Sequence, residues 1–170
     1  MGYALQALVT ADATVQNADS MPPGIEWREL ECGFVMLPMT EDLLTFLRGE
    51  EEETREFPLE GFWKLSPQAY QLALSLSAKG PVAYVEAEFF GGVGGQSGVV
   101  WNAQNIILGP IHTTDGDDSK NVTAINQVLR AVGVEREAEQ DEFVLMRLDR
   151  HANTQDWADE DPEYPSDEPW

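Results

Sequence analysis

The chain has 170 residues, 42% of them hydrophobic, and a net charge of −21 from 31 acidic and 10 basic side chains. This length fits one domain that folds without the help of disulfide bonds or bound metal ions. A single cysteine, Cys32, excludes an intramolecular disulfide or a multi-cysteine metal site. The negative field repels nucleic-acid phosphates and anionic lipid headgroups, so it argues against both as partners and favours either solubility alone or a basic protein partner.

The N-terminal part of the chain predicts strands followed by a helix. Residues 3–9 form an apolar run with one polar residue, which fits a first strand. Residues 25–39 predict a strand pair or one long strand, interrupted at Gly33 by a tight turn or a bulge. Thr40 is a good N-cap for a short helix with acidic residues in its first turn, and this helix should end near Gly49.

The middle of the chain carries its clearest helix and a meander. Ser66 caps a predicted helix with proline in its first turn, and Gly80-Pro81 ends it. The segments 82–90, 99–101 and 106–110 are rich in strand-forming residues. Because the connections between them are too short for a parallel crossover, we predict a three-stranded antiparallel meander.

The glycine-rich stretch 91–98 invites comparison with phosphate-binding loops. It lacks the Lys-Ser/Thr ending of a Walker A loop and the GxGxxG spacing, and it joins two predicted strands rather than a strand and a helix. We therefore predict a flexible hairpin loop or a close backbone approach, with a partner-contact surface as the second interpretation. The glycines concerned are Gly91, Gly92, Gly94 and Gly95.

The last part of the chain predicts a third helix over 122–132, with Gly133 as its C′ residue. Residues 141–148 are apolar enough to dock as a final helix or strand. The whole pattern predicts an α+β fold, with a mostly antiparallel sheet packed by about three helices in a single domain, residues 1–155.

From Asp156 onward, seven acidic residues, three prolines and no basic residue predict a disordered acidic tail, residues 156–170. This tail carries two tryptophans, Trp157 and Trp170. An acidic segment with aromatic residues is typical of a short interaction element that orders on binding, although a simple unstructured end is the alternative.

Two acidic groups are candidates for a site. On a strand Glu86 and Glu88 project to the same face, about 7 Å apart, which suits metal binding or paired acid/base work but also a solvated outer face. Asp115, Asp117 and Asp118 resemble the opening of a calcium loop, but the glycine and glutamate that an EF-hand needs are missing, which favours a solvated turn. We predict no catalytic residue, metal ion or cofactor, and count both acidic groups as candidate partner contacts.

The stretch 83–97, followed by Trp101, resembles a signature of small acidic bacterial proteins without an assigned activity, and the similarity extends over most of the chain up to Trp157. Those proteins look like immunity-type partners of bacterial toxins, so the resemblance implies a binding function and no catalytic residue.

The expected function is therefore a protein-interaction module, an immunity or inhibitor protein that binds a basic partner such as a toxin. A small hydrolase or metal-dependent enzyme using Glu86 and Glu88 is the alternative, and a subunit of a larger assembly is a third. The first residues lack the basic region and apolar core of a signal peptide, so we expect a cytoplasmic location.

Overall fold

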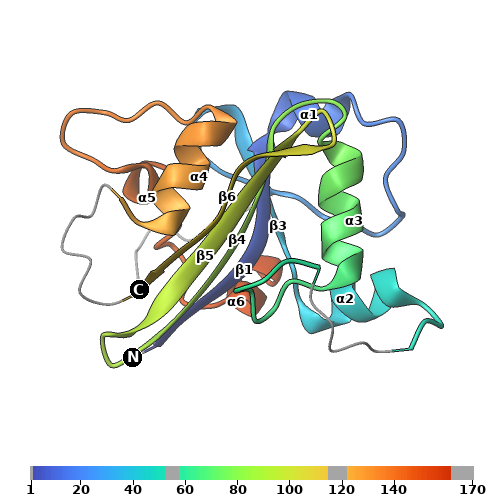
Figure 1. Cartoon of the computed structure of the whole chain (residues 1–170), viewed down its shortest axis with the longest axis horizontal. Helices are drawn as coiled ribbons and strands as arrows, with labels where there is room; N and C mark the ends of the chain where they lie inside the picture. Colours follow the sequence, from blue (N-terminus) through green and yellow to red (C-terminus); the bar gives the residue numbers. More distant parts are fainter. Residues whose placement is uncertain (1, 53–57, 115–121, 162–170) are drawn as a thin grey trace.

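The computed structural model describes residues 2–52, 58–114 and 122–161. It has the predicted α+β architecture: a six-stranded antiparallel sheet in the order β2-β3-β1-β4-β5-β6, with helices on both faces (Figure 1). The strands are β1 (Gly2–Ala11), β2 (Arg28–Glu29), β3 (Phe34–Pro38), β4 (Val82–Phe90), β5 (Val93–Asn102) and β6 (Asn105–Thr114). The described helices are α1 (Asp12–Gln16), α2 (Glu41–Arg48), α3 (Pro67–Leu76), α4 (Ala124–Val132), α5 (Glu142–Leu145) and α6 (Thr154–Ala158).

The three longest described helices, α2, α3 and α4, are the three that the sequence predicts, and their ends have the expected chemistry. The hydroxyl of Thr40 accepts the N–H of Leu43 at the start of α2, and that of Ser66 accepts the N–H of Ala69 at the start of α3. Gly133 ends α4 in the left-handed conformation, with φ of 110°. None of the described helices has the length and apolarity that a membrane crossing requires.

The segment 25–39 is a strand pair, because a 3-10 turn at Glu31–Gly33 reverses the chain between β2 and β3. The predicted meander is also present as β4, β5 and β6. Its glycine-rich connection is much shorter than the eight-residue loop predicted from the sequence. Only Gly91 and Gly92 form the turn, both with positive φ, and β5 begins at Val93.

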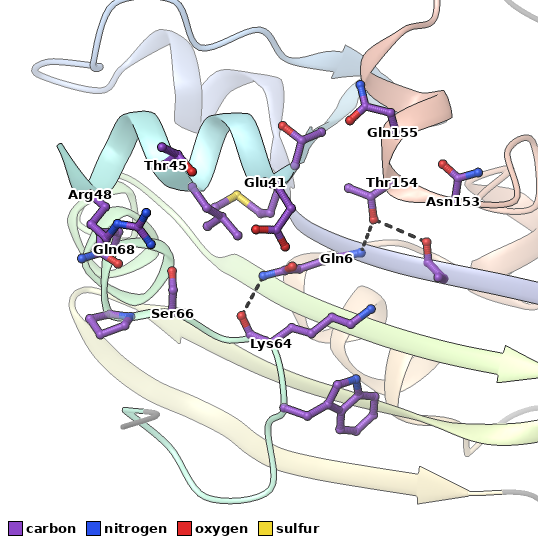
Figure 2. Close-up of a pocket in the computed structure, with 16 residues that line it drawn as sticks. Gln6, Glu41, Thr45, Arg48, Lys64, Ser66, Gln68, Asn153, Thr154 and Gln155 are labelled. Carbon is purple, nitrogen blue, oxygen red and sulfur yellow. Dashed lines mark hydrogen bonds between the residues drawn. The ribbon is translucent and has the colours of Figure 1, made fainter. Parts of the chain in front are cut away.

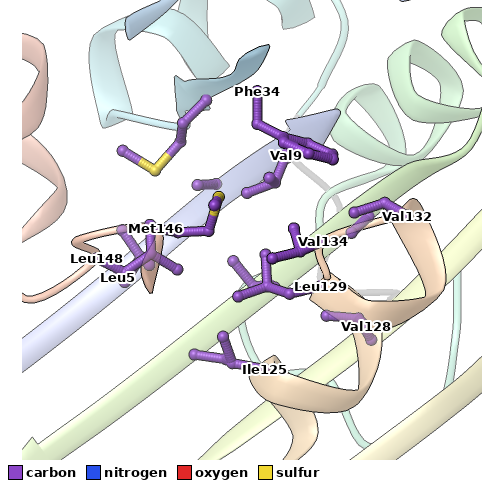
Figure 3. Packing of buried hydrophobic residues seen from close by; sticks show 14 of the residues in the cluster. Leu5, Val9, Phe34, Ile125, Val128, Leu129, Val132, Val134, Met146 and Leu148 are labelled. Carbon is purple, nitrogen blue, oxygen red and sulfur yellow. The ribbon is translucent and has the colours of Figure 1, made fainter. Parts of the chain in front are cut away.

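Alternation of side chains along the strands produces two separate cores. On one face, α2, α3 and the segment before α3 cover a cluster that includes Leu8, Tyr84 and Trp101. On the other face, α4, α5 and α6 cover a cluster that includes Val9 and Leu129 (Figure 3). The central strands are therefore buried on both faces, which explains the almost continuous apolar runs in their sequences.

The predicted tail from Asp156 is wrong for residues 156–160, because α6 docks on the domain and fully buries Trp157. The guanidinium of Arg150 lies 4.5 Å from the centre of the Trp157 ring and forms an ion pair of 2.9 Å with Glu160. Arg28 donates to the main-chain carbonyl of Trp157 at 2.9 Å. Arg28 and Arg150 thus hold α6 and Glu160 against the rest of the fold, and the domain extends beyond the predicted boundary at residue 155.

Candidate functional site

Glu86 lies at the middle of β4 and anchors the segment that precedes α3. Its side chain is completely buried, and its carboxylate accepts the main-chain N–H groups of Trp63 at 2.8 Å and Lys64 at 3.1 Å. The hydroxyl of Tyr84 donates to the same carboxylate at 2.8 Å, and the side-chain amide of Gln6 donates to the carbonyl of Lys64 at 2.9 Å. These bonds hold the segment 61–65 across the face of the sheet, where it has no strand partner of its own.

Burial raises the pKa of Glu86 above its ordinary value, although the hydrogen bonds that it accepts and the nearby charge of Lys64 act in the opposite direction. Glu88, two positions further along β4, is exposed and forms an ion pair of 3.2 Å with the Lys64 ammonium. The solvated-face interpretation is therefore wrong for Glu86 and confirmed for Glu88. Because Glu86 is engaged by backbone donors and Glu88 lies outside, the two carboxylates do not share a pocket as the hydrolase alternative requires.

The tip of the β4–β5 hairpin exposes an apolar pair. Phe90 and Val93 face each other across the two-glycine turn and are 79% and 72% exposed. Trp63 is 41% exposed, and its ring lies over Gly95, where an added Cβ would stand 4.0 Å from the ring. By alternation along β5, Val93 and Gly95 point to the same face. Trp63, Phe90 and Val93 are thus three exposed apolar side chains on one face of the sheet, called here the hairpin-tip patch. The hairpin tip lies beside the start of β1, where Gly2 pairs with Phe90 (Figure 1).

A cavity of about 510 Å³ adjoins this patch, between α2, β1, the start of α3 and the start of α6 (Figure 2). Trp63 belongs to the patch and also lines the cavity, so the two features share this side chain, and Lys64 lies beside it in the lining. The remaining charged side chains of the lining are Glu41 and Arg48, both from α2. A mixed lining of this kind suits polar contacts with a partner.

One serine–histidine contact lies on the same face. The hydroxyl of Ser97 on β5 is 2.7 Å from Nδ1 of His112 on β6. Ser97 is completely buried, so its oxygen is closed to a substrate, and the contact joins two strands rather than forming a nucleophile. Among residues 2–52, 58–114 and 122–161, no group of three His, Cys, Asp or Glu side chains could hold a metal ion.

The structure brings only part of the predicted site together. Glu88, Gly91, Gly92, Gly94 and Gly95 lie at the end of the sheet that carries the hairpin-tip patch, and Glu86 lies nearby at the middle of β4. Trp157 is buried in the opposite core and cannot meet a partner, which corrects its prediction as a contact residue. Asp115, Asp117, Asp118 and Trp170 fall outside the described residues.

Sequence reasoning missed the three side chains of the hairpin-tip patch. The signal was present in Phe90-Gly91-Gly92-Val93, since two glycines between strand formers are typical of a two-residue hairpin turn. Nothing in the sequence places Trp63 over Gly95, because that contact depends on Glu86 holding a segment from a distant part of the chain.

No protein-family model, curated protein or solved structure matches the chain. Its own geometry and charge are therefore what indicate its function.

Proposed function

We propose that this chain is a protein-interaction module that binds a basic protein, as an immunity or inhibitor protein does when it neutralises a basic toxin. The observation that carries the proposal is the hairpin-tip patch, in which Phe90, Val93 and Trp63 stand exposed in a strongly acidic chain. Large apolar side chains in this position cost solubility unless a partner covers them, and aromatic residues are enriched among those that dominate binding energy.

The hairpin suits this role because its tip is conformationally restricted. Gly91 and Gly92 adopt the positive φ angles that a two-residue turn between twisted strands requires. Phe90 and Val93 are therefore held as a cross-strand pair before any partner arrives, which lowers the entropy lost on binding.

The net negative charge of the chain favours its association with a basic protein. The last 15 residues contain seven acidic and no basic side chains, so the remaining net charge of −14 belongs to residues 1–155. A field of this sign steers a basic protein toward the chain and raises the association rate by roughly 10 to 1000-fold at low salt. For a toxin with a cationic active site, carboxylates around the bound patch would cover that site and block its substrate.

The test uses the product of the neighbouring gene, since an immunity protein is encoded beside its toxin. We expect calorimetric titration of the purified chain with that product to show binding that weakens steeply between about 50 mM and about 300 mM NaCl. We also expect the double substitution Phe90→Ser and Val93→Ser to weaken binding by about tenfold or more.

A matched control is Phe46→Ser, which removes another exposed aromatic side chain from α2 on a different part of the surface. It should bind as the wild-type chain does. Absence of binding at low salt would reject the proposed partner, whereas full binding by the double variant would show that the hairpin-tip patch is not the contact surface.

A further inference from the structure

A second cleft, of about 300 Å³, opens on the opposite face of the same end of the sheet. Three aromatic side chains line it: Tyr3 and Phe89, which are paired across β1 and β4, and Phe143 from α5. The rings of Tyr3 and Phe143 meet edge to face, with their centroids 5.8 Å apart and their planes at 71°. The cleft thus has aromatic walls that come from three different elements.

Hydrogen bonds fix these walls. The hydroxyl of Tyr3 donates to the carbonyl of Leu148 at 3.0 Å, and the side-chain oxygen of Asn126 accepts the N–H of Phe143 at 2.8 Å. The side-chain oxygen of Gln96 accepts the N–H of Ile125, the second residue of α4, at 2.9 Å. The neutral polar groups of the lining are therefore occupied in holding the cleft together.

The charged groups of the lining have a single sign. Asp141 and Asp149 both line the cleft, and its described lining contains no lysine or arginine. Burial raises the pKa of Tyr3 well above its ordinary value, and the negative charge of Asp149 adds to this effect. Tyr3 therefore stays a neutral phenol at physiological pH, and it lines the same cleft as Asp149.

We propose that this cleft binds an organic cation, namely an alkylammonium or guanidinium group at the end of an apolar stem. The stem would lie against the aromatic walls, while the charge would meet Asp141, Asp149 and the negative faces of the rings. Cations are attracted to aromatic faces by about 0.5–2 kcal/mol, and more when they are desolvated. This site goes beyond the proposed function, since it uses none of the three residues of the hairpin-tip patch.

Such a cation has two sources, a free small molecule or a lysine or arginine side chain of a protein. The experiment follows backbone amide shifts of the full chain by NMR during titration with three probes: n-pentylammonium, its neutral counterpart 1-pentanol, and the blocked peptide acetyl-Gly-Arg-Gly-amide. We expect shifts around Tyr3 and Phe143, and an affinity for a cationic probe at least tenfold higher than for 1-pentanol. Binding of the free cation identifies a small-molecule site, whereas binding of the peptide alone identifies a side-chain site, and either result supports the proposal.

Substitution of the two aspartates by asparagine tests whether their charge, rather than the shape of the cleft, determines the affinity. Asp149→Asn and Asp141→Asn should each lower the affinity for the cationic probe severalfold, and asparagine can still cap α5 at position 141 as aspartate does. Asp42→Asn, an exposed change on α2, is the matched control and should leave the affinity unchanged. Thermal unfolding of each variant verifies that it is folded.

The proposal is overturned if 1-pentanol binds as tightly as the cations do, because the cleft would then select only for apolar surface. It is also overturned if neither cationic probe shifts the amides around the cleft, or if folded Asp149→Asn and Asp141→Asn retain full affinity.

Discussion

Glu86 is the residue on which the candidate face depends, because its two carboxylate oxygens receive the N–H groups of Trp63 and Lys64. In Glu86→Gln, one of these oxygens becomes an NH₂ group that faces a donor. We expect this substitution to lower the free energy of unfolding by about 1–3 kcal/mol, since a buried donor is left without an acceptor. The measurement is urea unfolding at neutral pH, and the control is Glu88→Gln, whose exposed ion pair should contribute no more than about 1 kcal/mol. Equal losses in the two variants would contradict the role of Glu86.

The raised pKa of Glu86 gives its contribution a definite pH dependence. Between the ordinary value of 4.5 and the raised value, the folded state holds a proton that the unfolded chain has released, so stability falls as pH rises through this window. The variant Glu86→Gln lacks this group. We therefore expect the difference in unfolding free energy between wild type and variant to shrink as the pH rises from 4.5 through the raised pKa of Glu86. Urea unfolding at several pH values measures it, and a difference that grows with pH would contradict the prediction.

The β4–β5 hairpin shows how an element depends on one small residue. At Gly94 an added Cβ would stand only 1.9 Å from the carbonyl oxygen of Glu88, so the two strands approach too closely for any other residue. We expect Gly94→Ala to lower stability by about 1–3 kcal/mol and to displace the tip. In Gly95→Ala the nearest atom is 3.2 Å from the new Cβ, and the loss should be smaller. Thermal unfolding compares the two, and a larger loss in Gly95→Ala would show that the strands yield at Gly94.

Elements with local signals were predictable, and those that depend on distant contacts were not. The caps Thr40 and Ser66 lie within a few residues of the helices they begin, and the sequence places both correctly. The glycines of β5 predicted a loop rather than a strand. The close approach of the Glu88 backbone, which requires glycine at this point of the strand, cannot be recognised in the sequence. The burial of Glu86 was equally hidden, since its main-chain donors lie 22 and 23 residues away along the chain.

At the scale of the whole molecule, α6 belongs to the folded domain, although most of its residues fall in the tail that the sequence predicts. Trp157 is buried in the core on this face of the sheet, where α6 packs on β1 and β3, and Arg150 covers its ring. A chain that ends at Gln155 loses this side chain, and we expect its stability to fall by about 3–5 kcal/mol or its cooperative unfolding to disappear. A chain that ends at Asp161 keeps α6 and the ion pair of Glu160, and it serves as the control in urea unfolding. Equal stability of the two chains would contradict the assignment of α6 to the core.

The net charge of −21 acts on the whole fold as well as on any partner. Unfolding increases the distance between like charges, so self-repulsion destabilises the compact state, and salt that screens this repulsion should stabilise it. We expect the midpoint of thermal unfolding to rise by several degrees from about 10 mM to about 300 mM NaCl, where the Debye length becomes shorter than the spacing of most surface charges.

The exposed residues Glu50 and Glu52 provide a control, because replacing both with glutamine removes two of the repelling charges. That variant should start from a higher midpoint at low salt and gain less from added NaCl. A midpoint that falls with salt in the wild-type chain would mean that its few ion pairs, such as Arg150 with Glu160, outweigh the repulsion among its carboxylates.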